Sequence, residues 1–313
     1  MTPPTREAYL SAPLPIEREL RALLHPDDVR VVFDVGACEG EDSIRYSRLF
    51  PKAVVYAVEP LPQNLPLIEA NLKRHPTGRI HVLTLALADA RGTSRFYVSS
   101  GQPEGALASD DWDYGNKSSS LLPPARHVQI HPWVHFEDAI EVAADTLSNV
   151  CRERSVTEID LVHLDVQGAE LKVLEGAGPL IDRIKVIWLE VEAIALYEGQ
   201  PLKADVERFM FHHSFRKLVD RVDAVSGDQL WVNEALVTIP LSLRVRGSTL
   251  FRVASGLRHR LAHSLRRLQS GMIPTRNPRP GAAVARRRRG RHVYDARVAG
   301  DKIRASFGMA VTR

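Results

Sequence analysis

The feature of this sequence that most constrains its fold is a strand–glycine–helix junction near the N-terminus. Residues 31–42 read V-V-F-D-V-G-A-C-E-G-E-D, so an apolar run ends around Asp34, breaks at Gly36 and enters a helix after Gly40. A second apolar run ends in an acid, Glu59, which follows Gly36 by 23 residues. Parallel α/β sheets bind ligands at the carboxyl ends of their strands, so this layout predicts a nucleoside pocket there.

The spacing of the glycines restricts which class of ligand this loop can bind. A dinucleotide fingerprint, G-x-G-x-x-G, would need glycines where Cys38 and Glu41 stand, and no G-K-[ST] follows for a phosphate-binding loop. Gly36 allows a close backbone approach to a ligand, and the Glu59 carboxylate can accept hydrogen bonds from both ribose hydroxyls. This form of loop suits a nucleoside without a pyrophosphate. S-adenosylmethionine is the leading candidate.

Composition indicates a globular protein that works in a reducing compartment. The chain has 313 residues, of which 44% are hydrophobic and 26% charged, enough for one large domain or two small ones. Two cysteines do not make a disulfide framework. The N-terminal residues lack a signal peptide's basic and apolar regions, and no apolar run approaches the ~20 residues of a membrane span. We therefore expect a cytoplasmic protein without an integral membrane segment.

The net charge of +4 conceals two unlike regions. Residues 1–240 carry a balance of −12 and residues 241–313 a balance of +16. In the basic region, leucines between 250 and 268 recur at helical spacing among arginines, and an Arg- and Pro-rich segment expected to be disordered follows. Three interpretations stay open: an arm for nucleic acid or an anionic membrane, a helix that packs on a second subunit, or an appendage without function.

Apolar runs and helical patterns alternate through the acidic part of the chain. The alternation predicts an α/β fold, Rossmann-like, with a mostly parallel sheet, helices on both faces and a terminal antiparallel hairpin. We expect an N-terminal extension with a short helix over 1–28, a catalytic domain over 29–235 and the tail over 236–313. The predicted strands are 31–35, 54–59, 80–87, 160–165, 185–191, 215–222 and 229–233. The predicted helices are 41–50, 63–74, 169–176 and 203–212. An added β-segment is expected over 93–98, before a long loop over 99–135.

A second group of acids follows the later strands. Residues 159–170 read I-D-L-V-H-L-D-V-Q-G-A-E, which places Asp165 at the carboxyl end of a central strand and Glu170 in the first turn of the next helix. Glu190 ends the neighbouring strand. We expect Asp165 to be the catalytic base, with Glu170 or Glu190 behind it. The alternatives are that Asp165 caps the helix or binds Mg²⁺, and that Glu170 only complements the helix dipole.

Several strings in combination resemble the FkbM family of S-adenosylmethionine-dependent methyltransferases. The resemblance covers roughly residues 25–235. Its strings are F-D-V-G-A-C-E-G at 33–40, A-V-E-P at 57–60 with Asn64 beyond it, A-L-A-D-A-R-G at 86–92, K-S-S-S-L-L-P at 117–123, L-D-V-Q-G-A-E-L-K-V-L-E-G-A at 164–177 and V-I-W-L-E-V at 186–191. Two positions depart from the family pattern: Gln167 stands where many members have glutamate, and Ser148 stands where aspartate is common.

The resemblance implies a seven-stranded methyltransferase that methylates a hydroxyl of a sugar, a glycan or a polyketide-like product. It implies that Asp34 and the glycine loop hold the methionine end of the cofactor, that Glu59 holds the ribose and that Asp89 lies near the adenine. The full set predicted to bind the cofactor is Asp34, Gly36, Ala37, Cys38, Gly40, Asp42, Ser43, Glu59, Pro60, Ala88, Asp89, Ser118 and Ser119.

Two further expectations concern metal ions and an alternative function. The spacing of His127, His131 and His135 is four residues, but Pro132 interrupts a helix there and no acid or cysteine completes a set, so no metal site is predicted. The alternative to an enzyme is a noncatalytic nucleoside-binding scaffold that its basic tail anchors to nucleic acid or an anionic membrane.

Overall fold

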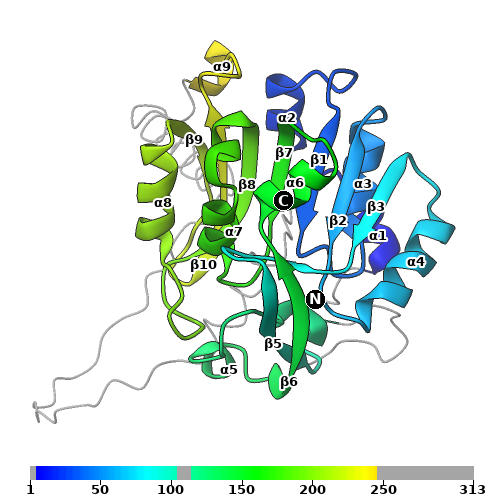
Figure 1. Ribbon diagram of the computed structural model, residues 1–313, viewed down its shortest axis with the longest axis vertical. Coiled ribbons are helices and arrows are strands. Elements are labelled where there is room, and N and C mark those ends of the chain that lie inside the picture. Colours follow the sequence, from blue (N-terminus) through cyan, green and yellow to red (C-terminus); the bar gives the residue numbers. More distant parts are fainter. Residues whose placement is uncertain (1–4, 104–113, 245–313) are drawn as a thin grey trace, which may run out of the picture.

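The computed structural model describes residues 5–103 and 114–244 (Figure 1). Within these ranges an α/β core carries a second, smaller sheet. The predicted basic helix between 250 and 268 and the Arg-rich segment after it lie outside the described residues. No helix among the described residues has both the length and the apolar content needed to cross a membrane.

The main sheet has seven strands in the order β3-β2-β1-β7-β8-β10-β9. All its pairings are parallel except those of β10, which is antiparallel to both β8 and β9. The predicted mostly parallel sheet with a terminal antiparallel hairpin is therefore confirmed. The strands are β1 Val31–Val35, β2 Val54–Val58, β3 Arg79–Leu83, β7 Ile159–Leu164, β8 Ile184–Glu192, β9 Phe215–Asp220 and β10 Ser226–Asn233.

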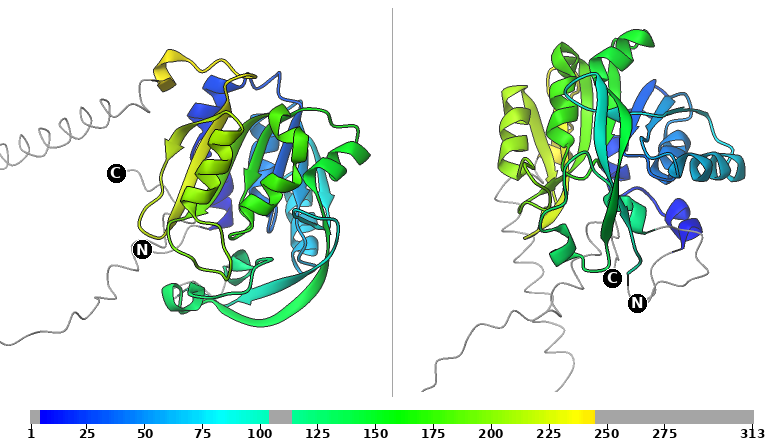
Figure 2. Two further views of the ribbon diagram at one scale, coloured as in Figure 1. Left: turned by 60° about the vertical axis from the view of Figure 1, so that its left-hand side comes forward. Right: turned by 60° about the horizontal axis from the view of Figure 1, so that its bottom comes forward.

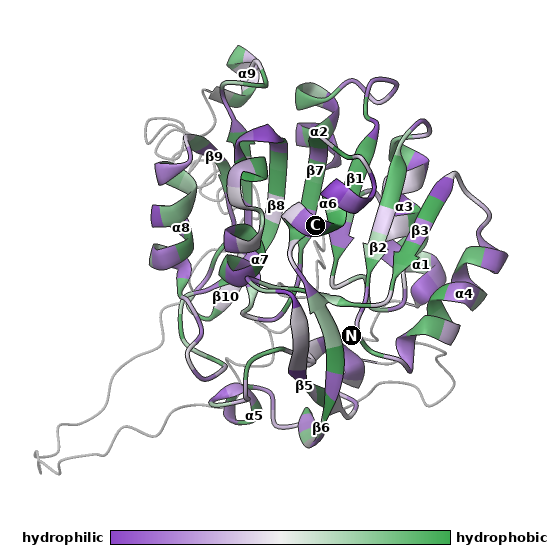
Figure 3. Cartoon of the chain, in the orientation of Figure 1, coloured by the Kyte–Doolittle hydropathy of each residue, from purple (hydrophilic) through white to green (hydrophobic). Residues whose placement is uncertain are grey.

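Helices cover both faces of this sheet, as the two views of Figure 2 show. Successive side chains of a strand point to opposite faces: Phe33 packs with the helices α6 and α7, whereas Val32 packs with α2 and α3. Figure 3 shows the central strands β7 and β8 as hydrophobic along most of their length, as expected for strands buried on both faces. The larger helices are α2 Glu17–Leu23, α3 Glu41–Leu49, α4 Asn64–Arg74, α6 Leu147–Glu153, α7 Glu170–Gly176 and α8 Lys203–His212.

The second sheet, of order β4-β6-β5, lies below the main sheet in Figure 1. Its strands are β4 Ala86–Leu87, β5 Gly92–Ser100 and β6 His135–Asp145. The expected β-segment over 93–98 is part of β5, but the expected strand over 80–87 is split into β3 and β4. Strand β6 was not predicted, because acids interrupt its apolar residues. Between β5 and β6 lie the 3₁₀-helix η1 Gly115–Ser118 and the short helix α5 His127–Ile130, and a second 3₁₀-helix, η2 Gly178–Arg183, precedes β8.

The segments that precede β1 and follow β10 in the chain pack onto the same hydrophobic core as the main sheet. Leu20 of α2, Val237 and Leu243 belong to one hydrophobic cluster with the strands, and Leu243 lies in the short helix α9 Leu241–Arg244. The first helix, α1 Arg6–Ser11, was not predicted. Its Arg6 is buried and forms ion pairs with Glu39 and Glu41 of the glycine loop. The segments on both sides of the expected boundaries, 28/29 and 235/236, therefore share one core.

Candidate active site

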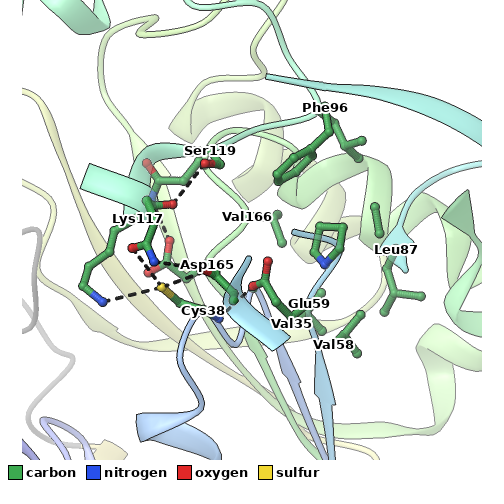
Figure 4. A pocket seen from close by; sticks show the side chains of 17 residues that line it. Val35, Cys38, Val58, Glu59, Leu87, Phe96, Lys117, Ser119, Asp165 and Val166 are labelled. Atoms are coloured by element: carbon green, nitrogen blue, oxygen red, sulfur yellow. Dashed lines mark hydrogen bonds between the residues drawn. The ribbon is translucent and has the colours of Figure 1, made fainter. Parts of the chain in front are cut away.

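A cavity opens where the carboxyl ends of β1, β2 and β7 meet the second sheet (Figure 4). One part of its wall is apolar and includes Leu87, Phe96 and Leu121. The rest is polar and includes Glu59 and Asp165. The cavity thus combines an apolar compartment with a few charged groups.

The glycine loop owes its shape to the neighbouring strand. Gly36 has φ +84°, and a Cβ at this position would lie 1.9 Å from the carbonyl oxygen of Asp165. Gly36 also donates its amide to Val58. Any larger residue would therefore collide with the backbone that follows β7. From the sequence, we expect a glycine here because the backbone would approach a ligand closely. The structure shows that Gly36 also lies close to the protein's own backbone at Asp165.

Glu59 is a buried acid whose two oxygens each accept one backbone hydrogen bond. Its Oε2 accepts from the amide of Cys38 at 2.8 Å, and its Oε1 accepts from the amide of Leu61 at 2.8 Å. Burial raises the pKa of Glu59 to about 7, although these donors oppose the shift. Each carboxylate oxygen has a further lone pair. Glu59 can therefore accept additional hydrogen bonds from hydroxyls of a ligand in the cavity.

Asp34 lies beneath the loop and does not line the cavity. Its Oδ1 lies 2.9 Å from Nδ1 of His163, and its Oδ2 accepts a hydrogen bond from the Ser43 hydroxyl at 2.5 Å. Burial disfavours the charged imidazole, but the hydrogen bond and the charge of Asp34 outweigh it and raise the pKa of His163 to about 9. At neutral pH the two side chains form a buried ion pair that joins β1 to β7.

Asp165 and Glu190 are linked by a neutral side chain. The Nε2 group of Gln167 donates to Oδ1 of Asp165 at 2.7 Å and to Oε2 of Glu190 at 3.0 Å. Gln167 has φ +54°, an uncommon conformation for a residue other than glycine. Burial raises the pKa of Asp165, and burial together with the charge of Asp165 raises the pKa of Glu190. Gln167, one of the two positions that depart from the pattern the sequence resembles, thus supplies the donor that two acids share.

Glu170 does not line the cavity. Its Oε1 accepts hydrogen bonds from the amides of Val166 at 3.1 Å and Gly168 at 3.2 Å, so it closes the turn between β7 and α7. Burial raises the pKa of Glu170 to about 7, and the charge of Asp165 adds to the shift.

The middle segment contributes residues that were not predicted to bind the cofactor. Lys117 and Asn116 of η1 line the cavity, and the Lys117 ammonium lies 3.5 Å from the Cys38 sulfur. Asn116 donates to Oδ1 of Asn64 at 2.8 Å. Asn64 and Lys117 belong to the sequence motifs that resemble the family, and these motifs were the one feature of the sequence that could have identified them. The wall residue Phe96 had none, because its position depends on how β5 packs against the main sheet.

The structure brings only part of the predicted set to the cavity. The predicted residues that line it are Gly36, Cys38, Glu59, Pro60, Ser119 and Asp165. Those that do not line it are Asp34, Ala37, Gly40, Asp42, Ser43, Ala88, Asp89, Ser118, Glu170 and Glu190. Among the latter, Asp89 forms an ion pair with Lys172 at 3.2 Å, and the Ser118 carbonyl accepts from the Tyr197 hydroxyl at 2.7 Å.

Within the described residues, no group of three or more histidine, cysteine or acidic side chains is arranged to hold a metal ion. The rings of His127 and His131 lie 4.9 Å apart, and the His127 ring packs beside Phe136 and Tyr197. Burial lowers the pKa of His127 to about 3 and also lowers that of His131. Both rings are therefore neutral members of an aromatic cluster at neutral pH.

The sequence is similar to those of two named methyltransferases. The 2-O-methyltransferase NoeI of Sinorhizobium fredii is 31% identical over 224 residues, which cover 71% of this chain and 87% of NoeI. The 31-O-demethyl-FK506 methyltransferase FkbM of Streptomyces tacrolimicus is 29% identical, over 56% of this chain and 73% of that protein. Among solved structures, magnesium protoporphyrin IX methyltransferase from Synechocystis PCC 6803, with bound SAM, aligns over 73% of this chain and 79% of that chain with 12% identity and a TM-score of 0.38.

The methyltransferase FkbM domain itself matches residues 34–217. This range begins at Asp34, the penultimate residue of β1, and closes in β9, so it includes every residue of the cavity wall. The chain belongs to the FkbM family of S-adenosylmethionine-dependent methyltransferases.

Proposed function

We propose that this protein transfers the methyl group of S-adenosylmethionine to a hydroxyl of a sugar, a glycan or a polyketide-like natural product. The observation that carries the proposal is that Glu59 and Asp165 line one cavity at the carboxyl ends of parallel strands. The names of the two relatives, a 2-O-methyltransferase and a methyltransferase of an O-demethyl compound, support oxygen as the acceptor atom.

The residues of the cavity fit such a cofactor. Glu59 would accept hydrogen bonds from the ribose hydroxyls through the lone pairs that its backbone donors leave. The apolar wall that contains Leu87, Phe96 and Leu121 suits an adenine ring. The loop between Gly36 and Gly40, which Asp34 supports from beneath, would hold the methionine portion.

A bound cofactor would supply a methyl group that its sulfonium has already activated, and it would leave as S-adenosylhomocysteine when its sulfur–methyl bond breaks. Asp165 then has the role of general base, which takes the proton of the acceptor hydroxyl as the new C–O bond forms. Burial raises the pKa of Asp165, and a base whose pKa is closer to the working pH removes a proton more effectively. Glu190, which shares the Gln167 donor, is the second acid of this proposal. Glu170 would act through the shape of the β7–α7 turn.

Calorimetry with S-adenosylmethionine, S-adenosylhomocysteine and NAD tests the cofactor assignment. We expect binding of the first two and none of NAD, because the loop lacks the glycines of a dinucleotide fingerprint. Transfer of a labelled methyl group to panels of sugars and macrolides then tests the acceptor. Tight binding of NAD without binding of either sulfur compound would refute the proposal. The cytoplasmic location and a contact of the basic tail with a polyanion or a second subunit stay predictions.

A further inference from the structure

A single glutamine, Gln167, lies between the proposed base and a second buried acid. It comes shortly after β7 and lines the cofactor cavity. Its Nε2 group donates to Oδ1 of Asp165 at 2.7 Å and to Oε2 of Glu190 at 3.0 Å. A primary amide has two N–H groups, so each of the two carboxylates can accept one of them. The donors of Gln167 are therefore both in use on acids.

The contacts of Gln167 fix the orientation of its amide. Its Oε1 accepts a hydrogen bond at 3.2 Å from the hydroxyl of Tyr197, a side chain that is buried. A reversed amide would direct its oxygen at two carboxylates, which have no donor to offer when they are ionised. The backbone is held as well, because the Gln167 carbonyl accepts from the Ser120 hydroxyl at 2.8 Å. The nitrogen therefore faces the acids and the oxygen faces Tyr197.

This hydrogen bond makes the two oxygens of Asp165 unequal. Oδ1 accepts from Gln167, whereas Oδ2 accepts no hydrogen bond from a residue in the described ranges. Asp165 also lines the cofactor cavity, so its side chain reaches the space that a ligand would enter. Oδ2 is therefore the oxygen with capacity to accept a proton from a hydroxyl in that space.

More acids than cations surround Asp165. The titratable groups whose charges interact with it are Asp42 of α3, Lys117 of η1, His163 of β7, Glu170 of α7, Glu190 and Glu192 of β8, Tyr197 beyond β8 and Asp228 of β10, and Cys38 and Glu59 lie in the same cavity wall. Burial raises the pKa of Asp165, and the hydrogen bond from Gln167 is the largest influence that lowers it. A donor to a carboxylate favours its charged form. The amide thus opposes both the burial and the neighbouring acids.

We infer that Gln167 is a positioning residue for the methyl transfer. Its amide holds Oδ1 of Asp165 so that Oδ2 takes the proton that the acceptor hydroxyl loses, and it keeps this carboxylate charged before the transfer. Gln167 itself neither gives nor takes a proton. The inference rests on the proposed function, which gives Asp165 the role of general base.

The test follows the titration of Asp165 itself, so it needs no acceptor. NMR spectra of the full chain, isotope-labelled at its aspartate carboxyl carbons, are recorded over a range of pH, and Asp165→Asn identifies the resonance. Gln167→Met removes both donors at a similar side-chain length, and Gln167→Glu puts an acid in their place. Each variant should raise the titration midpoint of Asp165 by about one pH unit or more, the effect of one lost hydrogen bond to a charged group.

Gln229 provides a matched control, because it is a buried glutamine that also bridges two acids. Its Nε2 group donates to Glu207 at 2.7 Å and to Asp220 at 3.4 Å, and it does not line the cofactor cavity. Gln229→Met and Gln229→Glu should leave the midpoint of Asp165 unchanged. Thermal unfolding shows which variants are folded. In the wild type, which needs no substitution, the side-chain amide signals of Gln167 should change with the same midpoint as Asp165.

The inference is wrong if a folded Gln167 variant keeps the wild-type midpoint of Asp165, if a Gln229 variant moves that midpoint equally, or if the Gln167 amide signals do not follow Asp165. The proposed function fails separately if the wild type does not bind S-adenosylhomocysteine. With an acceptor from the sugar and macrolide panels, the acidic limb of kcat should move to higher pH together with the midpoint. A limb that stays in place while the midpoint moves would show that Asp165 is not the base.

Discussion

The carboxyl ends of the strands form one edge of the main sheet, and this edge has two halves. The acids of the two halves differ in how many hydrogen-bond donors contact them. In the half formed by β1 and β2, Asp34 and Glu59 each contact two nitrogen or hydroxyl donors. In the half formed by β7, β8 and β10, Asp165 and Glu190 share the single donor of Gln167. Asp228 has no donor among the described residues.

Burial is common to both halves, since it raises the pKa of Glu59 as well as those of Glu190 and Asp228. The supply of donors is therefore what separates Asp34 and Glu59 from Asp165, Glu190 and Asp228. Glu170, which follows β7, accepts two backbone amides and is the exception in its half. The β1–β2 half has its hydrogen bonds in place before a ligand arrives, which is the arrangement expected for positioning a cofactor. The β7–β10 half keeps capacity to accept hydrogen bonds, which suits an acceptor and a proton transfer.

The largest expected effect comes from Asp165→Asn in the half that is short of donors. Without a general base, turnover should fall by about 10²–10⁴-fold. The affinity for S-adenosylhomocysteine should change little, because Glu59 and the glycine loop that Asp34 supports are unchanged. Single-turnover kinetics and calorimetry on the same protein measure the two effects, with Asp182→Asn as a matched control. Full turnover in the Asn variant would remove the functional distinction between the halves.

The next effect is a dependence of stability on pH that originates at Glu59. Its pKa is 4.5 as an ordinary glutamate and about 7 when buried here. The folded state therefore binds more protons than the unfolded state between these values, and the free energy of unfolding falls as pH rises from about 4.5 to about 7. The shift corresponds to on the order of 3 kcal/mol.

Glu59→Gln isolates this contribution, because the amide does not titrate. Denaturant unfolding at a series of pH values should show a smaller decline for the variant than for the wild type. The pKa of Glu170 is raised in both proteins, so its contribution to the pH dependence cancels when the variant is compared with the wild type. Equal declines would show that the two backbone donors of Glu59 fully offset its burial.

The smallest effect is the loss of cofactor affinity in Glu59→Gln. The amide keeps the size of the side chain but replaces a charged acceptor with a neutral group, so S-adenosylhomocysteine should bind about 1.5–3 kcal/mol more weakly. Calorimetry at a pH above 7, where the wild-type acid is ionised, gives the largest difference. Unchanged affinity would mean that Glu59 only holds the glycine loop and does not contact the ribose.

The sequence alone predicted the main sheet, its terminal hairpin and the acids that end its strands. Helix α8 begins and ends at the residues expected, and β1 does as well. Periodicity and turn residues specify such elements, because each depends on a few adjacent residues. The split between β3 and β4 and the strand β6 were missed, since their packing partner is the second sheet.

The motifs also identified Glu59 and Asp165 as the two acids of one cavity edge, because parallel strands place their carboxyl ends together. Only the tertiary structure decided which partners these acids have. Asp34 meets His163 across 129 residues of sequence, and Lys117 approaches Cys38 across 79. It also decided that Gly36 faces the carbonyl of Asp165. A short stretch of sequence sets where a strand ends, whereas the environment of a side chain depends on register and packing between segments far apart in the chain.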